Sequence, residues 1–129
     1  HRPISRQQIY ATKLAVGLAI YLVLSGLSVL LYALWAASPG THASPFAWSM
    51  TLTTWTIWLA ISAVYLGAFL SGIRPAAWFG TRLTPLAAAC GIAVIGASLP
   101  AAFTWPILIG IDALLVVLIL YVVRKRDFA

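Results

Sequence analysis

The chain has 129 residues, of which 63% are hydrophobic and only 8% are charged, and its formal net charge is +6. Soluble domains carry charge on roughly a quarter of their residues, so this composition excludes an ordinary soluble fold and is typical of a protein embedded in a bilayer. The positive charge does not indicate a nucleic-acid partner. The basic residues flank apolar runs, where such residues fix membrane orientation and meet anionic headgroups.

The first thirteen residues, HRPISRQQIYATK, are polar and basic. Ser5 and Gln8 have the spacing of a capping box, in which the serine hydroxyl and the glutamine side chain satisfy the first amides of a helix. Pro3 disfavours helical backbone at the residue before it. The pattern predicts a short N-terminal helix that begins near Arg6 and lies at the membrane interface.

Four apolar runs follow, at about residues 14–34, 51–70, 83–102 and 106–123. Each approaches the ~20 residues that a helix needs to cross the hydrocarbon of a bilayer. We therefore predict an all-α, polytopic membrane protein with four transmembrane helices and the short interfacial helix. Because the runs use most of the chain, residues 1–129 should form a single transmembrane domain.

The second run carries two stripes at helical spacing. A stripe of small residues favours close helix packing, and it consists of Ala63, Gly67 and Ser71. The other stripe is polar and aromatic, and it consists of Thr51, Trp55, Trp58, Ser62, Tyr65 and Phe69. This second stripe either lines a passage for an amphipathic molecule or packs against other helices. Trp58 and Tyr65 from this stripe, together with Thr54 from the same run, are candidates for polar contacts inside the membrane.

The third run is rich in alanine, and Ala89, Ala93 and Ala97 repeat every four residues. Such a face lets a neighbouring helix approach closely. After it, Pro100 and Pro106 are predicted to bracket a tight connection between the third and fourth helices.

Asp112 is the only acidic residue within an apolar run, and it follows Pro106 by six residues, roughly 9 Å inside the predicted helix end. An ionised Asp at the bilayer centre costs about 2.5–3.5 kcal/mol on insertion scales, so this side chain should face protein or water. Two interpretations stay open. Asp112 either contacts a substrate or proton, or is a protonated or hydrogen-bonded carboxyl that ties helices together.

Residues for catalysis or metal binding do not cluster in this sequence. Both histidines, His1 and His42, lie outside the apolar runs, and Cys90 has no histidine or carboxylate near it in the chain. No Ser/His/Asp set, carboxylate pair or glycine-rich phosphate loop occurs. We predict that the chain is not an enzyme and has no catalytic, metal-binding or cofactor-binding residue.

All eight basic residues fall on one side of the predicted spans: Arg2, Arg6, Lys13, Arg74, Arg82, Arg124, Lys125 and Arg126. The two remaining connections carry no charged residue. Because short basic loops stay in the cytoplasm, we expect both termini and the central loop to be cytoplasmic.

The segment Arg2-Pro3-Ile4-Ser5-Arg6, followed by Gln7-Gln8-Ile9 and by Lys13, resembles a recurring stretch of type 2 ABC exporter permeases. The tail Arg124-Lys125-Arg126-Asp127-Phe128 is similar to the ending of many such permeases. In that family the Pro-x-Ser-Arg segment forms a short cytoplasmic helix that docks on the ATPase.

The resemblance implies that Pro3, Ser5, Arg6 and Gln8 form an ATPase-coupling segment. It further implies a separate ABC ATPase subunit that uses ATP, a second permease copy in a homo- or heterodimer, and a bacterial inner membrane as location. By the same resemblance, this chain is the C-terminal four-helix part of a longer permease with six spans.

Two other functions remain open on the sequence. A non-catalytic four-helix subunit of a larger membrane complex requires only packing faces and a defined topology. A small proton-coupled multidrug transporter requires a membrane carboxylate, for which Asp112 is the one candidate.

Overall fold

The computed structural model describes residues 6–40, 45–74 and 79–126. The helices in these ranges are α1 (Arg6–Ala37), the short 3-10 helix η1 (Trp48–Thr51), α2 (Leu52–Ile73), α3 (Phe79–Ser98) and α4 (Ala101–Arg126). The same ranges contain no strand, so the predicted all-α class is confirmed.

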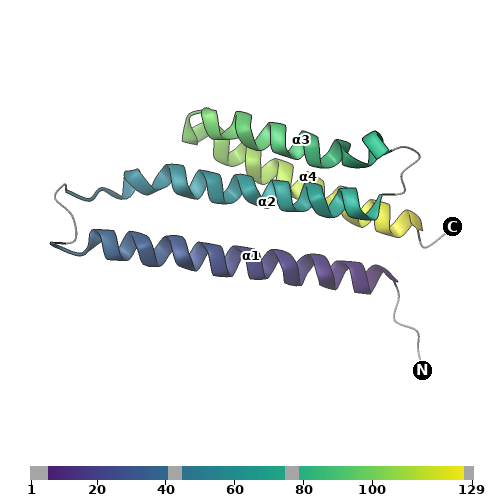
Figure 1. Cartoon of the computed structure of the whole chain (residues 1–129), viewed down its shortest axis with the longest axis horizontal. Helices are drawn as coiled ribbons and strands as arrows, with labels where there is room; N and C mark the ends of the chain where they lie inside the picture. The colour runs from purple at the N-terminus through teal and green to yellow at the C-terminus, as the bar shows by residue number, and fades with distance from the viewer. Residues whose placement is uncertain (1–5, 41–44, 75–78, 127–129) are drawn as a thin grey trace, which may run out of the picture.

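Successive helices run in alternating directions, so that both ends of the chain lie at the same end of the bundle (Figure 1). Helix α2 is central. It packs most extensively against α3 and α4, whereas α1 lies along α2 and the margin of α4 with far less contact. The α3 and α4 helices make little direct contact with each other, and both pack against α2.

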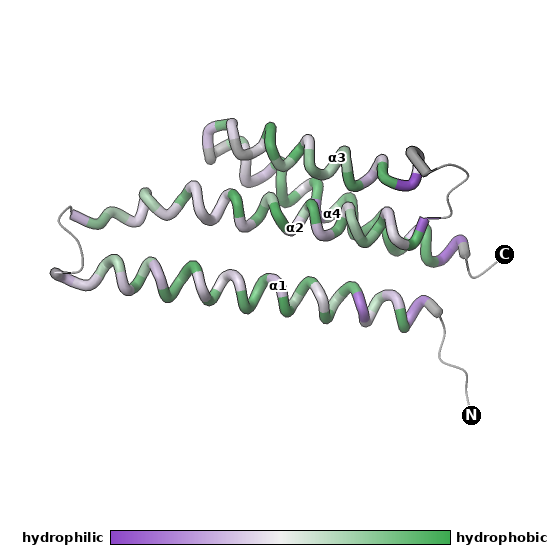
Figure 2. The backbone as a smooth tube through the Cα atoms, in the orientation of Figure 1, coloured by the Kyte–Doolittle hydropathy of each residue, from purple (hydrophilic) through white to green (hydrophobic). Residues whose placement is uncertain are grey.

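Hydrophilic residues gather at the end of the bundle where the termini lie (Figure 2). We call this the basic end, and the charged side chains described there include those of Lys13, Arg74, Arg82, Arg124 and Lys125. The opposite end is called the uncharged end, because residues 38–40, 45–51 and 99–100 include no charged side chain. The predicted topology requires this grouping.

Within the described residues, three helices are long and apolar enough to cross a membrane: Gln7–Ala37, Trp48–Ile73 and Phe103–Lys125. The shortest of them has 23 residues, roughly 34 Å, against about 30 Å of hydrocarbon. The apolar part of α3, Thr81–Gly96, is shorter at roughly 24 Å. The fold is therefore a helical bundle with three candidate spans, which suggests a membrane-embedded protein.

The first helix begins at Arg6, where the sequence predicts a helix start, and continues without a break to Ala37. No second helix boundary separates the polar N-terminal residues from the apolar run. The predicted interfacial segment therefore forms the first turns of α1. Pro3 and Ser5, on which the capping prediction depends, lie outside the described residues.

The predicted connection between the third and fourth helices is wrong in its boundaries. Helix α3 ends at Ser98, and residues 101–102, assigned to the third run, already belong to α4. Pro106 does not bound the connection but is the sixth residue of α4. A proline at this position lacks the N–H that would bond to the carbonyl four residues earlier, and its ring crowds that carbonyl. The helix nevertheless continues through Pro106 to Arg126.

Thr104 stabilises the connection between α3 and α4, which consists of the two residues Leu99 and Pro100. Its side chain is fully buried, and its Oγ1 lies 3.0 Å from the carbonyl oxygens of Gly96 and Leu99 and 3.1 Å from that of Pro100. Carbonyls at a helix C-terminus lack partners within the helix. The Thr104 hydroxyl supplies a donor to this cluster from the first turn of α4.

The main hydrophobic core lies between α1, α2 and α4, in the half of the bundle nearer the basic end. It consists of Leu14, Ala63, Leu66, Leu70, Ile73, Leu115, Ile119 and Val123. Helix α3 packs on the other side of α2. There a Cβ on Gly67 would lie 2.5 Å from the Ala89 Cβ and 3.0 Å from the Pro85 carbonyl oxygen. The small residues at 67 and 89 thus let these two helices approach closely.

Candidate functional site

The carboxyl group of Asp112 lies against α2. The Ser62 hydroxyl donates to Asp112 Oδ2, and the same hydroxyl oxygen is 2.6 Å from the Leu59 carbonyl oxygen. Ser62 is 1% exposed, and Asp112 Oδ1 is buried with no hydrogen-bond partner among the described residues. A serine hydroxyl has one proton, and here it lies near two acceptors, the Leu59 carbonyl and the Asp112 carboxyl. Both acceptors are hydrogen-bonded to Ser62 only when the carboxyl carries a proton of its own.

Asp112 lies deeper than the sequence indicates. Because α4 begins at Ala101, Asp112 is eleven residues from the helix start, roughly 16 Å, and not the roughly 9 Å expected from a start at Pro106. Ser62 occupies the middle of α2 in the same way. The pair therefore joins the midpoints of two helices, and this geometry fits the interpretation of Asp112 as a tie between helices.

A second polar cluster connects α1 to α2. The Trp58 Nε1–H donates to Ser25 Oγ at 2.9 Å, and the Tyr21 hydroxyl donates to the Trp58 carbonyl oxygen at 2.7 Å. The Ser25 hydroxyl in turn donates to the carbonyl of Tyr21, four residues earlier in α1. Gly26 lies under the Trp58 ring, where a Cβ would be 3.3 Å from the Trp58 Cζ2.

Tyr65 contacts α1 at Gly17, nearer the basic end than the Trp58 contact. Its hydroxyl occupies the space that a Cβ on Gly17 would need, and its ring packs against Phe69 with centroids 6.5 Å apart. The candidate residues Trp58 and Tyr65 therefore share the α1 interface, whereas Asp112 meets α2 through Ser62. The polar and aromatic stripe of α2 is occupied by helix contacts over this stretch.

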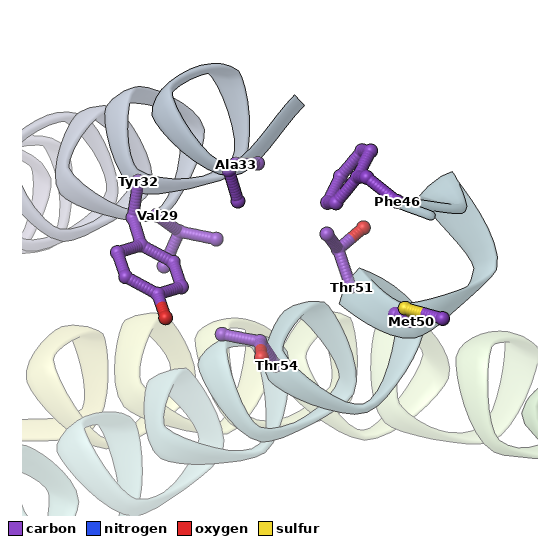
Figure 3. A pocket seen from close by; sticks show the side chains of 8 residues that line it. Val29, Tyr32, Ala33, Phe46, Met50, Thr51 and Thr54 are labelled. Carbon is purple, nitrogen blue, oxygen red and sulfur yellow. The ribbon is translucent and has the colours of Figure 1, made fainter. Parts of the chain in front are cut away.

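Thr54 does not join these residues. It lines an open pocket of about 250 Å³ near the uncharged end, between α1 and the start of α2. Figure 3 shows Tyr32 from α1 and Thr54 from α2 reaching toward the space between the helices, with Phe46 and Met50 at one side. This pocket is mostly apolar and is formed partly by η1.

A further contact between α2 and α4 lies nearer the uncharged end. The Trp105 Nε1–H donates to Thr56 Oγ1 at 3.2 Å, and the Thr56 hydroxyl donates to the Leu52 carbonyl oxygen at 2.9 Å. Sequence reasoning did not single out Thr56, Ser25 or Tyr21 as contact residues. The one sequence feature that could identify them is a polar side chain inside an apolar run. That feature does not predict which helix the side chain will contact.

In the predicted coupling segment, the structure describes only part of the chain. Arg6 is the first residue of α1, and Gln8, exposed, lies in its first turn. Pro3 and Ser5 are outside the described residues. The coupling role of all four residues stays a prediction.

Among the described residues, no three His, Cys, Asp or Glu side chains come together, and Cys90 is exposed on α3. The chain matches no protein-family model, no curated protein and no solved structure. Fold and contacts together define the class: an all-helical bundle, with three helices able to span a membrane, whose polar groups join its helices.

Proposed function

We propose that this chain is a membrane-spanning permease component of an ATP-driven ABC exporter, coupled through its N-terminal segment to a separate ATPase subunit. The observation that carries the proposal is the basic segment that precedes Lys13, which resembles the coupling stretch of type 2 ABC permeases. The start of α1 at Arg6, within this segment, supports it.

The mechanical properties of α1 also support the proposal. It is one helix of 32 residues, so a displacement of its first turn is transmitted along its length as a rigid-body motion. Only 6% of its most apolar window is buried, against 50% for α2. A long helix held by few contacts can shift relative to the bundle when an ATPase moves its end.

In the full proposal, all four helices cross a bacterial plasma membrane and both termini are cytoplasmic. The grouping of Lys13, Arg74, Arg82, Arg124 and Lys125 at one end supports this orientation, since basic flanks stay inside. A second permease copy would cover exposed apolar residues of α1, among them Val23, Leu24 and Leu31.

Co-purification with charge-reversed variants tests the coupling. We expect the chain, expressed in its native host, to retain a protein with nucleotide-binding motifs, and Arg6→Glu to reduce that retention at least tenfold. Lys125→Glu is the matched control, because it reverses one charge at the same end of the bundle on α4. Equal retention by Arg6→Glu and the unaltered chain would contradict the proposal.

A non-catalytic subunit of a larger membrane complex is the second candidate. The observation in its favour is that Asp112, Trp58 and Trp105 each contact another helix of the same chain. This function predicts stable association with a multi-subunit complex that contains no nucleotide-hydrolysing protein, so the same purification separates the two candidates.

A further inference from the structure

An apolar groove lies between α3 and α4 in the half of the bundle nearer the basic end, with α2 as its floor. Its volume is about 420 Å³, within the roughly 300–1,000 Å³ of typical ligand sites. The walls are built almost entirely of aliphatic side chains, and the groove is open to one side. It is separate from the Asp112 contact and from the pocket at Thr54.

The α4 wall of the groove is about as long as one membrane leaflet is deep. On α4 it runs from Ile111, at mid-helix, to Val122, a distance of eleven residues or roughly 16 Å. The hydrocarbon of a bilayer is about 30 Å thick, so half of it is about 15 Å. On α3 the lining is shorter and runs from Thr84 to Ile92, eight residues or roughly 12 Å.

The end of the groove nearer the termini is polar and cationic. Arg74, at the C-cap of α2, is its one charged lining residue, and Tyr121 and Thr84 line the same end. The Arg74 side chain is exposed and makes no hydrogen bond to another described side chain or backbone group. The one described acid, Asp112, is not in the lining and lies nine residues from Tyr121, roughly 14 Å along α4.

A second cation flanks this end. Arg82 lies at the start of α3, with its Nε 3.4 Å from the Ser71 carbonyl oxygen and its terminal nitrogen 3.5 Å from that of Gly72. Arg82 is thereby held beside the last turn of α2, whereas Arg74 stays exposed toward the groove. The charged side chains described at this end are all cationic, and they favour an anionic group.

We propose that this groove binds one acyl chain of an anionic phospholipid of the basic-side leaflet, with the lipid phosphate on the Arg74 guanidinium. The aliphatic walls receive the chain, the leaflet-deep length of the α4 wall matches its extension from headgroup to midplane, and the cation selects the headgroup. The proposal rests on the membrane placement proposed above and is independent of coupling to an ATPase.

Photolabelling in reconstituted vesicles tests the site. The full chain is placed in vesicles that contain either phosphatidylglycerol or phosphatidylcholine with a diazirine in the acyl chain, and labelled peptides are mapped by mass spectrometry. We expect phosphatidylglycerol to label the groove walls on α3 and α4 about fivefold more than phosphatidylcholine, the preference that one cation near anionic headgroups confers.

Two variants and two matched controls locate the interaction. Arg74→Gln should remove the headgroup preference, and Lys125→Gln, which removes one exposed charge elsewhere at the basic end, should keep it. Ala88→Trp, in the groove wall, should lower groove labelling by phosphatidylglycerol several-fold. Its neighbour Ala87 is exposed but outside the lining, so Ala87→Trp should not.

Three results would overturn the proposal: equal groove labelling by the two lipids, an unchanged preference in Arg74→Gln, or no lipid label on the groove walls, as expected if a second copy of the chain covers them. Circular dichroism of each variant checks that it has folded. Since Arg74 is exposed, Arg74→Gln decides the question even where Ala88→Trp does not fold. A negative photolabelling result would not change the ATPase co-purification result, so the two experiments test the lipid site and the ATPase coupling separately.

Discussion

The helices α1 and α2 are both strongly apolar, yet the bundle buries them very differently. In α2, 50% of the most apolar window is buried, whereas in α1 the figure is 6%. The buried positions of α2 include five small residues, Ala60, Ser62, Ala63, Gly67 and Ser71. Helix α1 carries larger side chains at most of its positions and exposes them, among them Leu24 and Leu31.

The difference teaches that hydrophobicity alone does not decide which helix is central. Between apolar helices in lipid there is no hydrophobic driving force, so close backbone approach and hydrogen bonds decide association. Helix α2 provides small residues for close approach and groups for hydrogen bonds on several of its faces. Helix α1 offers a few separate contacts, at Leu14, Gly17 and the Tyr21–Ser25 cluster.

The largest expected effect comes from blocking close approach. Gly67→Leu should lower the free energy of unfolding by about 3 kcal/mol, the upper part of the range for overpacking, because its Cβ would meet the Pro85 backbone oxygen and the Ala89 Cβ. Unfolding in detergent micelles, followed by circular dichroism, measures this. Gly72→Leu on the same helix is the control, since nothing lies within 4 Å of its Cβ. Similar losses in both variants would contradict the role of α2–α3 contact.

The next effect concerns the tie between the midpoints of α2 and α4. Ser62→Ala should cost about 1–2 kcal/mol, because it leaves the buried Asp112 carboxyl without its partner. Asp112→Asn keeps a donor and an acceptor beside Ser62 and should change stability by less than about 0.5 kcal/mol. The same unfolding assay compares them. If Asp112→Asn abolishes transport while leaving stability unchanged, Asp112 has a role beyond tying helices.

A smaller effect is expected at the connection between α3 and α4. Thr104→Val should cost about 1 kcal/mol, because it removes, with little change in shape, the one hydroxyl donor that lies within 3.1 Å of the carbonyl oxygens of Gly96, Leu99 and Pro100. Thr53→Val, at an exposed position of α2, should have little effect. Hydrogen exchange of the amides around Pro100 gives a local measurement, and unchanged protection there would count against the role of Thr104.

The smallest effect should appear at α1. Tyr21→Phe removes the hydrogen bond to the Trp58 carbonyl and should cost about 0.6 kcal/mol, the average for a hydrogen bond between membrane helices. Tyr32→Phe on the exposed side of α1 is the control. A loss above about 2 kcal/mol in Tyr21→Phe would show that α1 is held as firmly as α3 and α4, and would remove the contrast between the helices.

Much of the bundle follows from the apolar runs and their flanks. Sequence reasoning located all four long helices, because runs of apolar residues bounded by polar or turn residues favour helices in a bilayer; the helix start that it predicts near Arg6 stays a prediction, since the described residues begin there. It placed the end of α3 and the start of α4 wrongly, because Pro106 looked like a boundary. A proline in the second turn of a helix reads the same in sequence as one outside it.

The candidate site was predicted less completely. Asp112, Trp58 and Tyr65 stand out as polar or aromatic groups in apolar runs, but Ser25 and Gly17 do not, and Ser62 was placed in the polar and aromatic stripe without being paired with Asp112. Periodicity states which residues share a face of one helix, and it carries no information on which helix that face meets. Thr54 was grouped with Trp58 and Tyr65 by sequence, yet it lines a different pocket.

The sequence by itself determined that the chain is helical, where its apolar segments lie and that its charged residues gather at one end, since these features depend on local composition and chain order. Tertiary structure alone decided that α2 is central, that Ser62 meets Asp112, and that α3 and α4 leave a groove beside Arg74. Those features depend on distances between residues far apart in the chain, which are set by how small and large side chains fit together when the helices pack.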